Sequence, residues 1–118
     1  MRTDIGRFLE GRLLPTINLI KTIYDTALGA GHDVEARVDG RELVFAKGDG
    51  HAGRGFMRAT PHETSVTIAF PRGHELLDPK KRARGARGSE TRVLIRDQAD
   101  LDLYIRRMID AAYSLEGG

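Results

Sequence analysis

Positive charge is concentrated in one short segment of the chain that could bind anions. Residues 80–88 contain five lysines and arginines and no acidic residue. Clustered ammonium and guanidinium groups attract phosphates and carboxylates, and the glycines among them let backbone N–H groups approach an anion. The net charge of the whole chain is only +2, so the remainder is mildly acidic. We therefore predict a basic loop on an acidic body.

Further cations flank this loop and complete the candidate site. Its predicted ligand-binding residues are Arg72, His74, Lys80, Lys81, Arg84, Arg87 and Arg92. The expected ligand is a small anionic molecule or an acidic protein partner. No aromatic residue interleaves with the run, so base stacking is not indicated and nucleic acid is a weakly supported partner. A solvated loop with no ligand is the alternative interpretation of such a run.

A second loop is rich in glycine. Residues 48–53, GDGHAG, match the pattern G-x-G-x-x-G of dinucleotide-binding proteins. The pattern should open a helix whose N-terminus receives the phosphate, but here a strand beginning at Phe56 follows. A phosphate-cradling loop assisted by His51 and Arg54 is one interpretation. The sequence favours the other, a connection that needs glycine for its turns.

Catalytic and metal-binding patterns are weak. The chain has no cysteine, and its serines lie outside any nucleophile-elbow context. The sequence therefore argues against an enzyme, predicts no cofactor and assigns no metal ligands. No two of the four histidines have the spacing of a helical metal pair. Metal handling stays open as an alternative function, with weak candidates in the histidines and in Asp33, Glu35 and Asp39.

The length and composition also predict the number of domains and the location of the protein. At 118 residues the chain is expected to form one domain over residues 1–118. We expect a cytoplasmic protein, because no signal peptide and no apolar run of about 20 residues is present. The oligomeric state is left open. Self-association through bare strand edges is a third possible function.

Two helices are predicted to position these loops. Residues 15–28 carry an apolar stripe at Ile17, Ile20, Tyr24 and Leu28, widened by Leu13, Leu14, Leu19 and Ile23. A second helix is expected to open at Asp97, which is a good N-cap with Asp100 three residues later. A short helix capped by Thr3 is possible within residues 1–12.

Alternating apolar residues predict strands at residues 34–38, 43–46, 56–60, 65–70 and 91–96. Asp39 and Gly40 predict a two-residue hairpin turn between the first two strands. The long loop of residues 71–89 lies between the last two strands. We therefore predict an α+β fold, in which N-terminal and C-terminal helices pack on one face of an antiparallel sheet of four to five strands.

One segment also resembles a known family. An aromatic-ended strand leads to G-x-x-L-x-D-P at residues 73–79, then to a glycine-containing turn at Gly85-Ala86-Arg87-Gly88 and a strand that starts near Arg92. This order resembles the uncharacterised YdhG-like domains of unknown function, over residues 56–113. The resemblance implies two helices on an antiparallel sheet, as in frataxin, and some relatives are labelled iron chaperones.

The resemblance bears on two questions, metal handling and how the long loop is held. Frataxin-type iron handling depends on an acidic ridge over the first helix and strand, and the helix predicted at residues 15–28 offers only Asp25. Within the G-x-x-L-x-D-P segment, Leu76 and its neighbour Leu77 are expected to anchor the loop onto the core. Arg92 is expected to pair with Asp78 or Glu75 and so to fix the loop.

Overall fold

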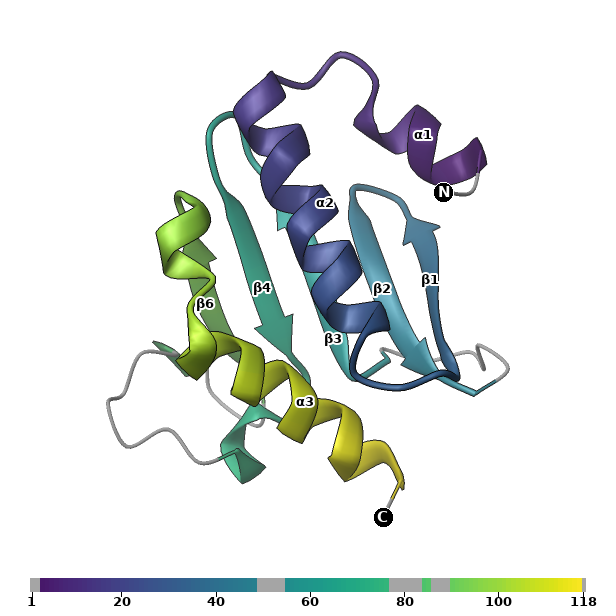
Figure 1. Ribbon diagram of the computed structural model, residues 1–118, viewed down its shortest axis with the longest axis vertical. Helices are drawn as coiled ribbons and strands as arrows, with labels where there is room; N and C mark the ends of the chain where they lie inside the picture. The colour runs from purple at the N-terminus through teal and green to yellow at the C-terminus, as the bar shows by residue number, and fades with distance from the viewer. Residues whose placement is uncertain (1–2, 49–54, 77–83, 86–89, 118) are drawn as a thin grey trace.

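The computed structural model describes residues 3–48, 55–76, 84–85 and 90–117, and over them it forms an antiparallel sheet (Figure 1). The strand order is β1-β2-β3-β4-β6-β5, and each neighbouring pair is antiparallel. Five strands have five or six residues and β5 has two. Their bounds are Val34–Asp39 (β1), Glu42–Lys47 (β2), Met57–Pro61 (β3), Val66–Phe70 (β4), Arg84–Gly85 (β5) and Thr91–Ile95 (β6).

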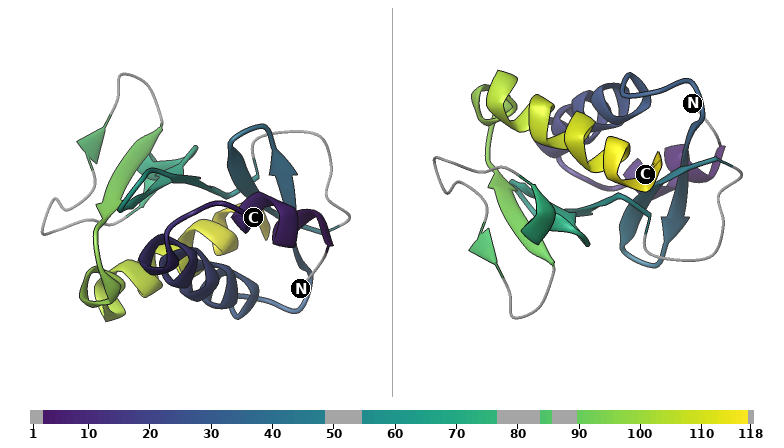
Figure 2. Two further views of the ribbon diagram at one scale, coloured as in Figure 1. Left: turned by 90° about the horizontal axis from the view of Figure 1, so that it is seen from above. Right: turned by 90° about the horizontal axis from the view of Figure 1, so that it is seen from below.

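Helices cover one face of this sheet. Both α2 (Leu14–Leu28) and α3 (Leu103–Gly117) lie on the same side of the strands, and α1 (Thr3–Leu9) lies beside the edge strand β1 (Figure 2). Of two short 3₁₀ helices, η1 (Gly73–Glu75) follows β4 and η2 (Gln98–Asp100) precedes α3. The predicted α+β class, with N-terminal and C-terminal helices on one face, is confirmed.

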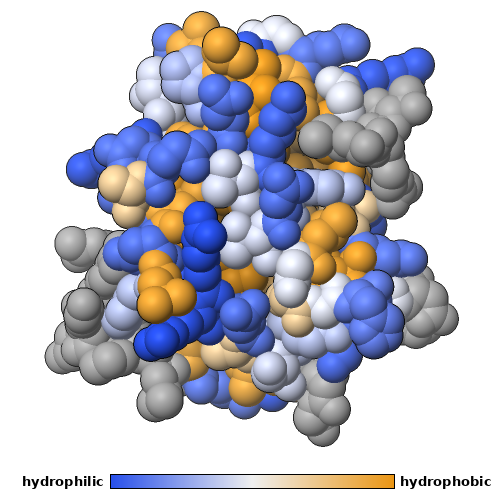
Figure 3. All heavy atoms as spheres, in the orientation of Figure 1, coloured by the Kyte–Doolittle hydropathy of each residue, from blue (hydrophilic) through white to orange (hydrophobic). Residues whose placement is uncertain are grey.

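The core lies between the helices and the sheet. Alternate residues of each strand face the helices, so Leu43 and Phe45 of β2 are fully buried, as is Ile68 of β4. The helices contribute Ile23 from α2 and Ile105 from α3, both also fully buried. On the solvent side of α2 and α3, hydrophilic atoms dominate the surface (Figure 3). The two-layer arrangement therefore follows from period-2 strands and period-3.6 helices that share one apolar surface.

The predicted cap of the last helix, Asp97, lies five residues before the residue that opens α3, Asp102. Asp97 does act as a cap, because its Oδ1 accepts from the Asp100 N–H at 3.2 Å, but the turn that it opens is η2. Leu101 then leaves helical geometry and is buried, with 2 % of its surface exposed. Asp102 accepts from the Ile105 N–H at 3.1 Å and opens α3. Burial of Leu101 therefore separates η2 from α3, which the sequence predicted as one helix.

Two other expectations also need correction. Leu13 and Leu14 were expected to widen the buried stripe of α2, but they are 48 % and 67 % exposed, because the helix meets the sheet only from Thr16 onward. In the first hairpin, Asp39 pairs with Glu42, so the turn residues are Gly40 and Arg41 rather than Asp39 and Gly40. Gly40 has the positive φ, 62°, that such a turn requires.

The two long loops predicted from sequence leave the same end of the sheet (Figure 1). One joins the end of β2 to the start of β3, and the other joins the end of β4 to the start of β6. Gly48 and Gly55, which flank the first loop, have φ values of 81° and 67°, as expected for glycine turns. At Gly55 a Cβ atom would also overlap the Phe45 carbonyl oxygen. His51 and Arg54 lie outside the described residues.

No helix in the described part of the chain is both long enough and apolar enough to cross a lipid bilayer.

Packing of α3 on the sheet generates the first prediction. Ile105→Ala removes a fully buried side chain and should lower the free energy of unfolding by about 2–5 kcal/mol. The matched control is Leu103→Ala in the same helix, where the side chain is 61 % exposed and the change should stay within about 0.5 kcal/mol. Urea unfolding measures both. Equal losses for the two variants would contradict the placement of α3.

Candidate anion-binding face of the sheet

Strand register brings arginines into one row on the face of the sheet that carries no helix. Reading across the strands, Arg37 pairs with Val44, Val44 with Arg58, Arg58 with Ala69, and Ala69 with Arg92. Residues that are paired in this way point to the same face. We call these five residues the arginine row. Adjacent strands lie about 4.8 Å apart, so the row spans about 19 Å.

The strand β5 extends the row by one register position. Its Arg84 pairs through the backbone with Arg92 on β6. The sequence predicts Arg84 and Arg92 in one site because of their shared charge. The pairing gives a structural reason, since 8 residues of sequence separation become a single strand spacing. Arg37 and Arg58 were missed because only the register of all the strands puts them in line with Arg92.

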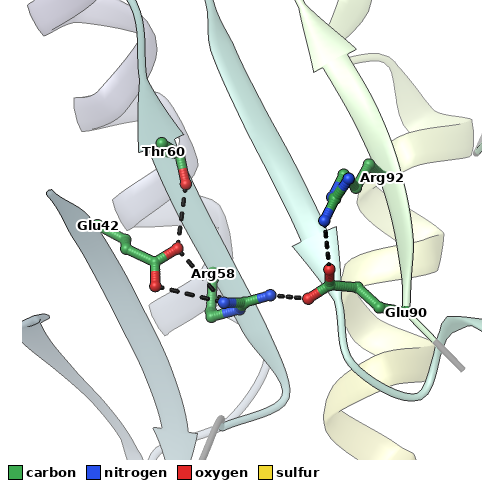
Figure 4. A network of polar contacts seen from close by, with 5 residues as sticks. All are labelled: Glu42, Arg58, Thr60, Glu90 and Arg92. Atoms are coloured by element: carbon green, nitrogen blue, oxygen red, sulfur yellow. Dashed lines mark hydrogen bonds and ion pairs between the residues drawn. The ribbon is translucent and has the colours of Figure 1, made fainter. Parts of the chain in front are cut away.

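A polar network holds the middle of the arginine row (Figure 4). The guanidinium of Arg58 lies between two carboxylates, with Nη1 3.3 Å from Oε1 of Glu42 and Nη2 paired with Oε1 of Glu90. Thr60 donates to Oε2 of Glu42 at 3.1 Å. The other oxygen of Glu90 accepts from Nη2 of Arg92 at 2.8 Å. The network thus links β2, β3 and β6 across the face.

Arg58 and Arg92 differ in how far their side chains are exposed to solvent, and this difference indicates different roles. The Arg58 side chain is 21 % exposed, and its Nε is buried without a hydrogen-bond partner in the described residues. Its positive charge is largely used inside the protein, since it is shared between the carboxylates of Glu42 and Glu90. The Arg92 side chain is 56 % exposed and meets Glu90 with one nitrogen. Arg92 is therefore the member of the pair that can reach an external anion.

Of the remaining predicted site residues, Arg72 and His74 lie in the described part of the chain. Arg72 forms a two-pronged ion pair with Glu75, at 2.6 and 2.9 Å, and donates to the Leu115 carbonyl at 3.0 Å. These bonds tie the start of the loop to the last turns of α3. His74 lies in η1. Three further residues fall outside the described residues, namely Lys80, Lys81 and Arg87.

Other contacts fix the segment of the family resemblance. Leu76 is buried at 9 % exposure, which confirms that it anchors the loop, while Leu77 and Asp78 lie outside the described residues. A Cβ atom at Gly73 would overlap the Thr91 side chain, so glycine is needed where η1 packs on β6. The expected pairing of Arg92 with Glu75 is wrong. Glu75 pairs with Arg72 three residues before it, and Arg92 pairs with the nearer Glu90.

A second polar contact joins the end of α3 to the sheet. The Tyr113 hydroxyl donates to Oδ1 of Asp33, and the Lys47 ammonium lies 4.4 Å from the centre of the Tyr113 ring. Phe56 meets the same ring edge-on at 5.7 Å. The Tyr113 hydrogen bond lowers the pKa of the Asp33 carboxyl below its ordinary value of 3.8. The same bond raises the pKa of Tyr113 above 10.0.

The acidic residues considered for metal handling are not gathered at one place. Asp33 is engaged by Tyr113, Glu35 is exposed within β1, and Asp39 ends that strand. Among the described residues, no group of three or more histidine and acidic side chains could hold a metal ion. The metal-handling alternative therefore stays a prediction that no described geometry supports. Self-association through the edge strands β1 and β5 likewise stays a prediction.

Comparisons with protein-family models, with curated proteins and with solved structures found no match to this chain. The resemblance to YdhG-like domains accordingly stays a prediction from residues 56–113.

The network around Arg58 generates a stability prediction. Arg58→Ala leaves the carboxylates of Glu42 and Glu90 without their shared cation, and should lower the free energy of unfolding by about 2 kcal/mol. Arg92→Ala removes a largely exposed partner and should cost less than about 1 kcal/mol. Chemical unfolding at neutral pH compares the two. A loss at Arg92 as large as that at Arg58 would show that the network is not centred on Arg58.

The contact between Asp33 and Tyr113 generates a pH prediction. Because the folded pKa of Asp33 is depressed, its stabilisation is complete above pH 3.8 and is lost as the pH falls through the folded value. Because the pKa of Tyr113 is raised, its stabilisation is complete below pH 10.0 and is lost as the pH rises through the folded value. Tyr113→Phe should therefore reduce stability most between these limits and return the Asp33 pKa toward 3.8.

The matched control for that prediction is Tyr24→Phe, which removes a hydroxyl from the partly buried Tyr24 on α2. Asp33 should titrate in this control as in the wild type when followed by NMR. An unchanged Asp33 pKa in Tyr113→Phe would show that the hydrogen bond does not form in solution.

Proposed function

We propose that this chain is a binding module for an extended anionic partner, which it contacts through the arginine row and the adjoining β5–β6 edge. The observation that carries the proposal is the alignment of Arg37, Arg58 and Arg92 across the helix-free face, with Arg84 at the next register position. Arginine suits this role because its planar fork matches carboxylate and phosphate oxygens.

The form of the surface favours an extended partner over a small molecule. The row lies along a sheet face about 19 Å across, and Val44 and Ala69 between the arginines are buried side chains that do not project. A small ligand requires a concave site, whereas cations spread along a sheet face match a series of anions. Aromatic residues are absent from the described positions of the row, so contact with phosphates or carboxylates is favoured over base stacking.

Charge on the neighbouring loop supports the same function. Lys80, Lys81 and Arg87 belong to the segment between β4 and β6, and β6 is the strand that carries Arg92. Because Arg58 is already paired with two carboxylates, the cation that the row offers to a partner is chiefly Arg92, whose side chain is 56 % exposed. The binding energy should therefore come mainly from the β5–β6 edge and depend on salt concentration.

The test uses three anionic probes in fluorescence anisotropy, namely polyphosphate, a short DNA duplex and a poly-glutamate peptide. The variant Arg84→Glu with Arg92→Glu should weaken binding of the preferred probe by more than about tenfold and flatten its dependence on salt. Preference among the probes identifies whether phosphates or carboxylates are recognised.

The control variant is Arg107→Glu, which changes an exposed arginine of α3 on the opposite side of the sheet. It should bind the probes nearly as the wild type does, apart from a small loss expected from net charge. The proposal fails if no probe binds the wild type, or if Arg107→Glu and the double variant lose the same affinity.

A further inference from the structure

The turns at the end of the sheet opposite the two long loops (Figure 1) line a cleft. It forms where the turn after β1 and the turn after β3 meet the loop between α1 and α2, and its volume is about 550 Å³. We call it the basic cleft. Its lining residues are Gly11, Arg12, Leu13, Arg41, Pro61, His62 and Glu63.

Three of the seven lining residues have nitrogen-bearing side chains. Arg12, Arg41 and His62 come from three segments that are far apart in the sequence, and Glu63 is the one acidic residue among the lining residues. Two guanidinium groups around a concave site provide several N–H donors for the oxygens of one phosphate or carboxylate. None of these residues belongs to the arginine row, so the basic cleft is separate from the proposed binding face.

Arg12 is held in place before any ligand arrives. Its Nε donates to the Phe8 carbonyl at 2.8 Å, and its Cζ lies 4.6 Å from the centre of the Phe8 ring. Both contacts restrain the side chain at Nε and at one guanidinium face, which leaves the outer donor edge to meet an anion. A preorganised side chain loses little conformational entropy on binding.

The walls of the basic cleft are joined by hydrogen bonds. Thr16 of α2 is fully buried, and its hydroxyl donates to the Glu63 carbonyl at 2.7 Å. The His62 ring nitrogen Nε2 lies 2.8 Å from the Thr67 hydroxyl, and the His62 backbone N–H donates to the Ser65 carbonyl at 2.8 Å. The Thr16 bond connects α2 to the turn after β3, and the His62 bonds hold that turn, so this side of the cleft is formed without a ligand.

The rim of the basic cleft is apolar. Leu13 and Leu14 are 48 % and 67 % exposed, and apolar atoms gather at this end of α2 (Figure 3). The first turn of α2 contains no acidic residue and no side-chain cap, so no negative charge of that turn offsets the two arginines. A ligand that is complementary to both the arginines and the exposed leucines carries an anionic group and an apolar part.

We infer that the basic cleft binds a small organic anion, with its phosphate or carboxylate group against Arg12, Arg41 and His62 and its apolar part against Leu13. The charged end is recognised by the two guanidinium groups and the imidazole. The apolar end covers leucine surface that would otherwise remain in water.

The test titrates the full chain with phenyl phosphate, benzoate and uncharged phenol while backbone amides are followed by NMR. The two anions distinguish phosphate from carboxylate recognition, and phenol reports the apolar contribution alone. At least one anion should bind more tightly than phenol and shift the amides of Gly11, Arg41 and His62. Arg41→Glu should weaken that binding by about tenfold or more, because it replaces a cation of an exposed turn with an acid.

Two control variants test whether the effect of Arg41→Glu is specific to the basic cleft. Arg107→Glu makes the same charge change outside the cleft lining and should bind the anion nearly as the wild type does. Arg92→Glu should also bind it nearly normally, which separates this inference from the proposed function of the arginine row. The inference is overturned if neither anion binds above phenol, if the shifted amides lie elsewhere, or if Arg41→Glu and Arg107→Glu have equal effects.

Discussion

Burial of one face of the sheet under α2 and α3 is the constraint on which the rest of the structure depends. Because side chains alternate along a strand, placing Leu43 and Phe45 against the helices turns Val44 to the opposite side. The same alternation places Arg58 opposite Met57 and Ala59, and Arg92 opposite Val93. The apolar core thus decides where the arginines lie, although none of them contributes to that core.

Charge on the helix-free face is then divided between structure and recognition. Two glutamates hold Arg58, and one of them also holds Arg92. An anion that draws Arg92 away leaves Glu90 still paired with Arg58, so the cost of releasing Arg92 is moderate. The basic cleft differs in this respect, because its lining residues include only one acid, Glu63. The two proposed sites therefore differ in form, one being a sheet face and the other a cleft, and they lie at different positions.

The sequence predicted the class of the fold and nearly every strand, because alternation and helical periodicity are local patterns. It failed where tertiary contacts overrode a local pattern, as at Leu101, whose burial divides the last helical segment, and at Leu13 and Leu14, which are exposed. Both candidate sites were difficult to predict for the same reason. The arginine row depends on the register of every strand in it, and the basic cleft gathers three loops. Only the charge run of residues 80–88, with Arg92 nearby, pointed toward one of them.

The register of the last strand has a consequence for the fidelity of folding. Val93 and Ile95 face the core, and Arg92 and Leu94 face away from it. A shift of one residue in the pairing with β4 would bury Arg92 among apolar side chains and expose Val93 and Ile95 to water. Such a misfolded form would lose its core and its outward charge together. A chain that misaligns this strand is therefore unstable. A stably folded molecule has Arg92 on the helix-free face.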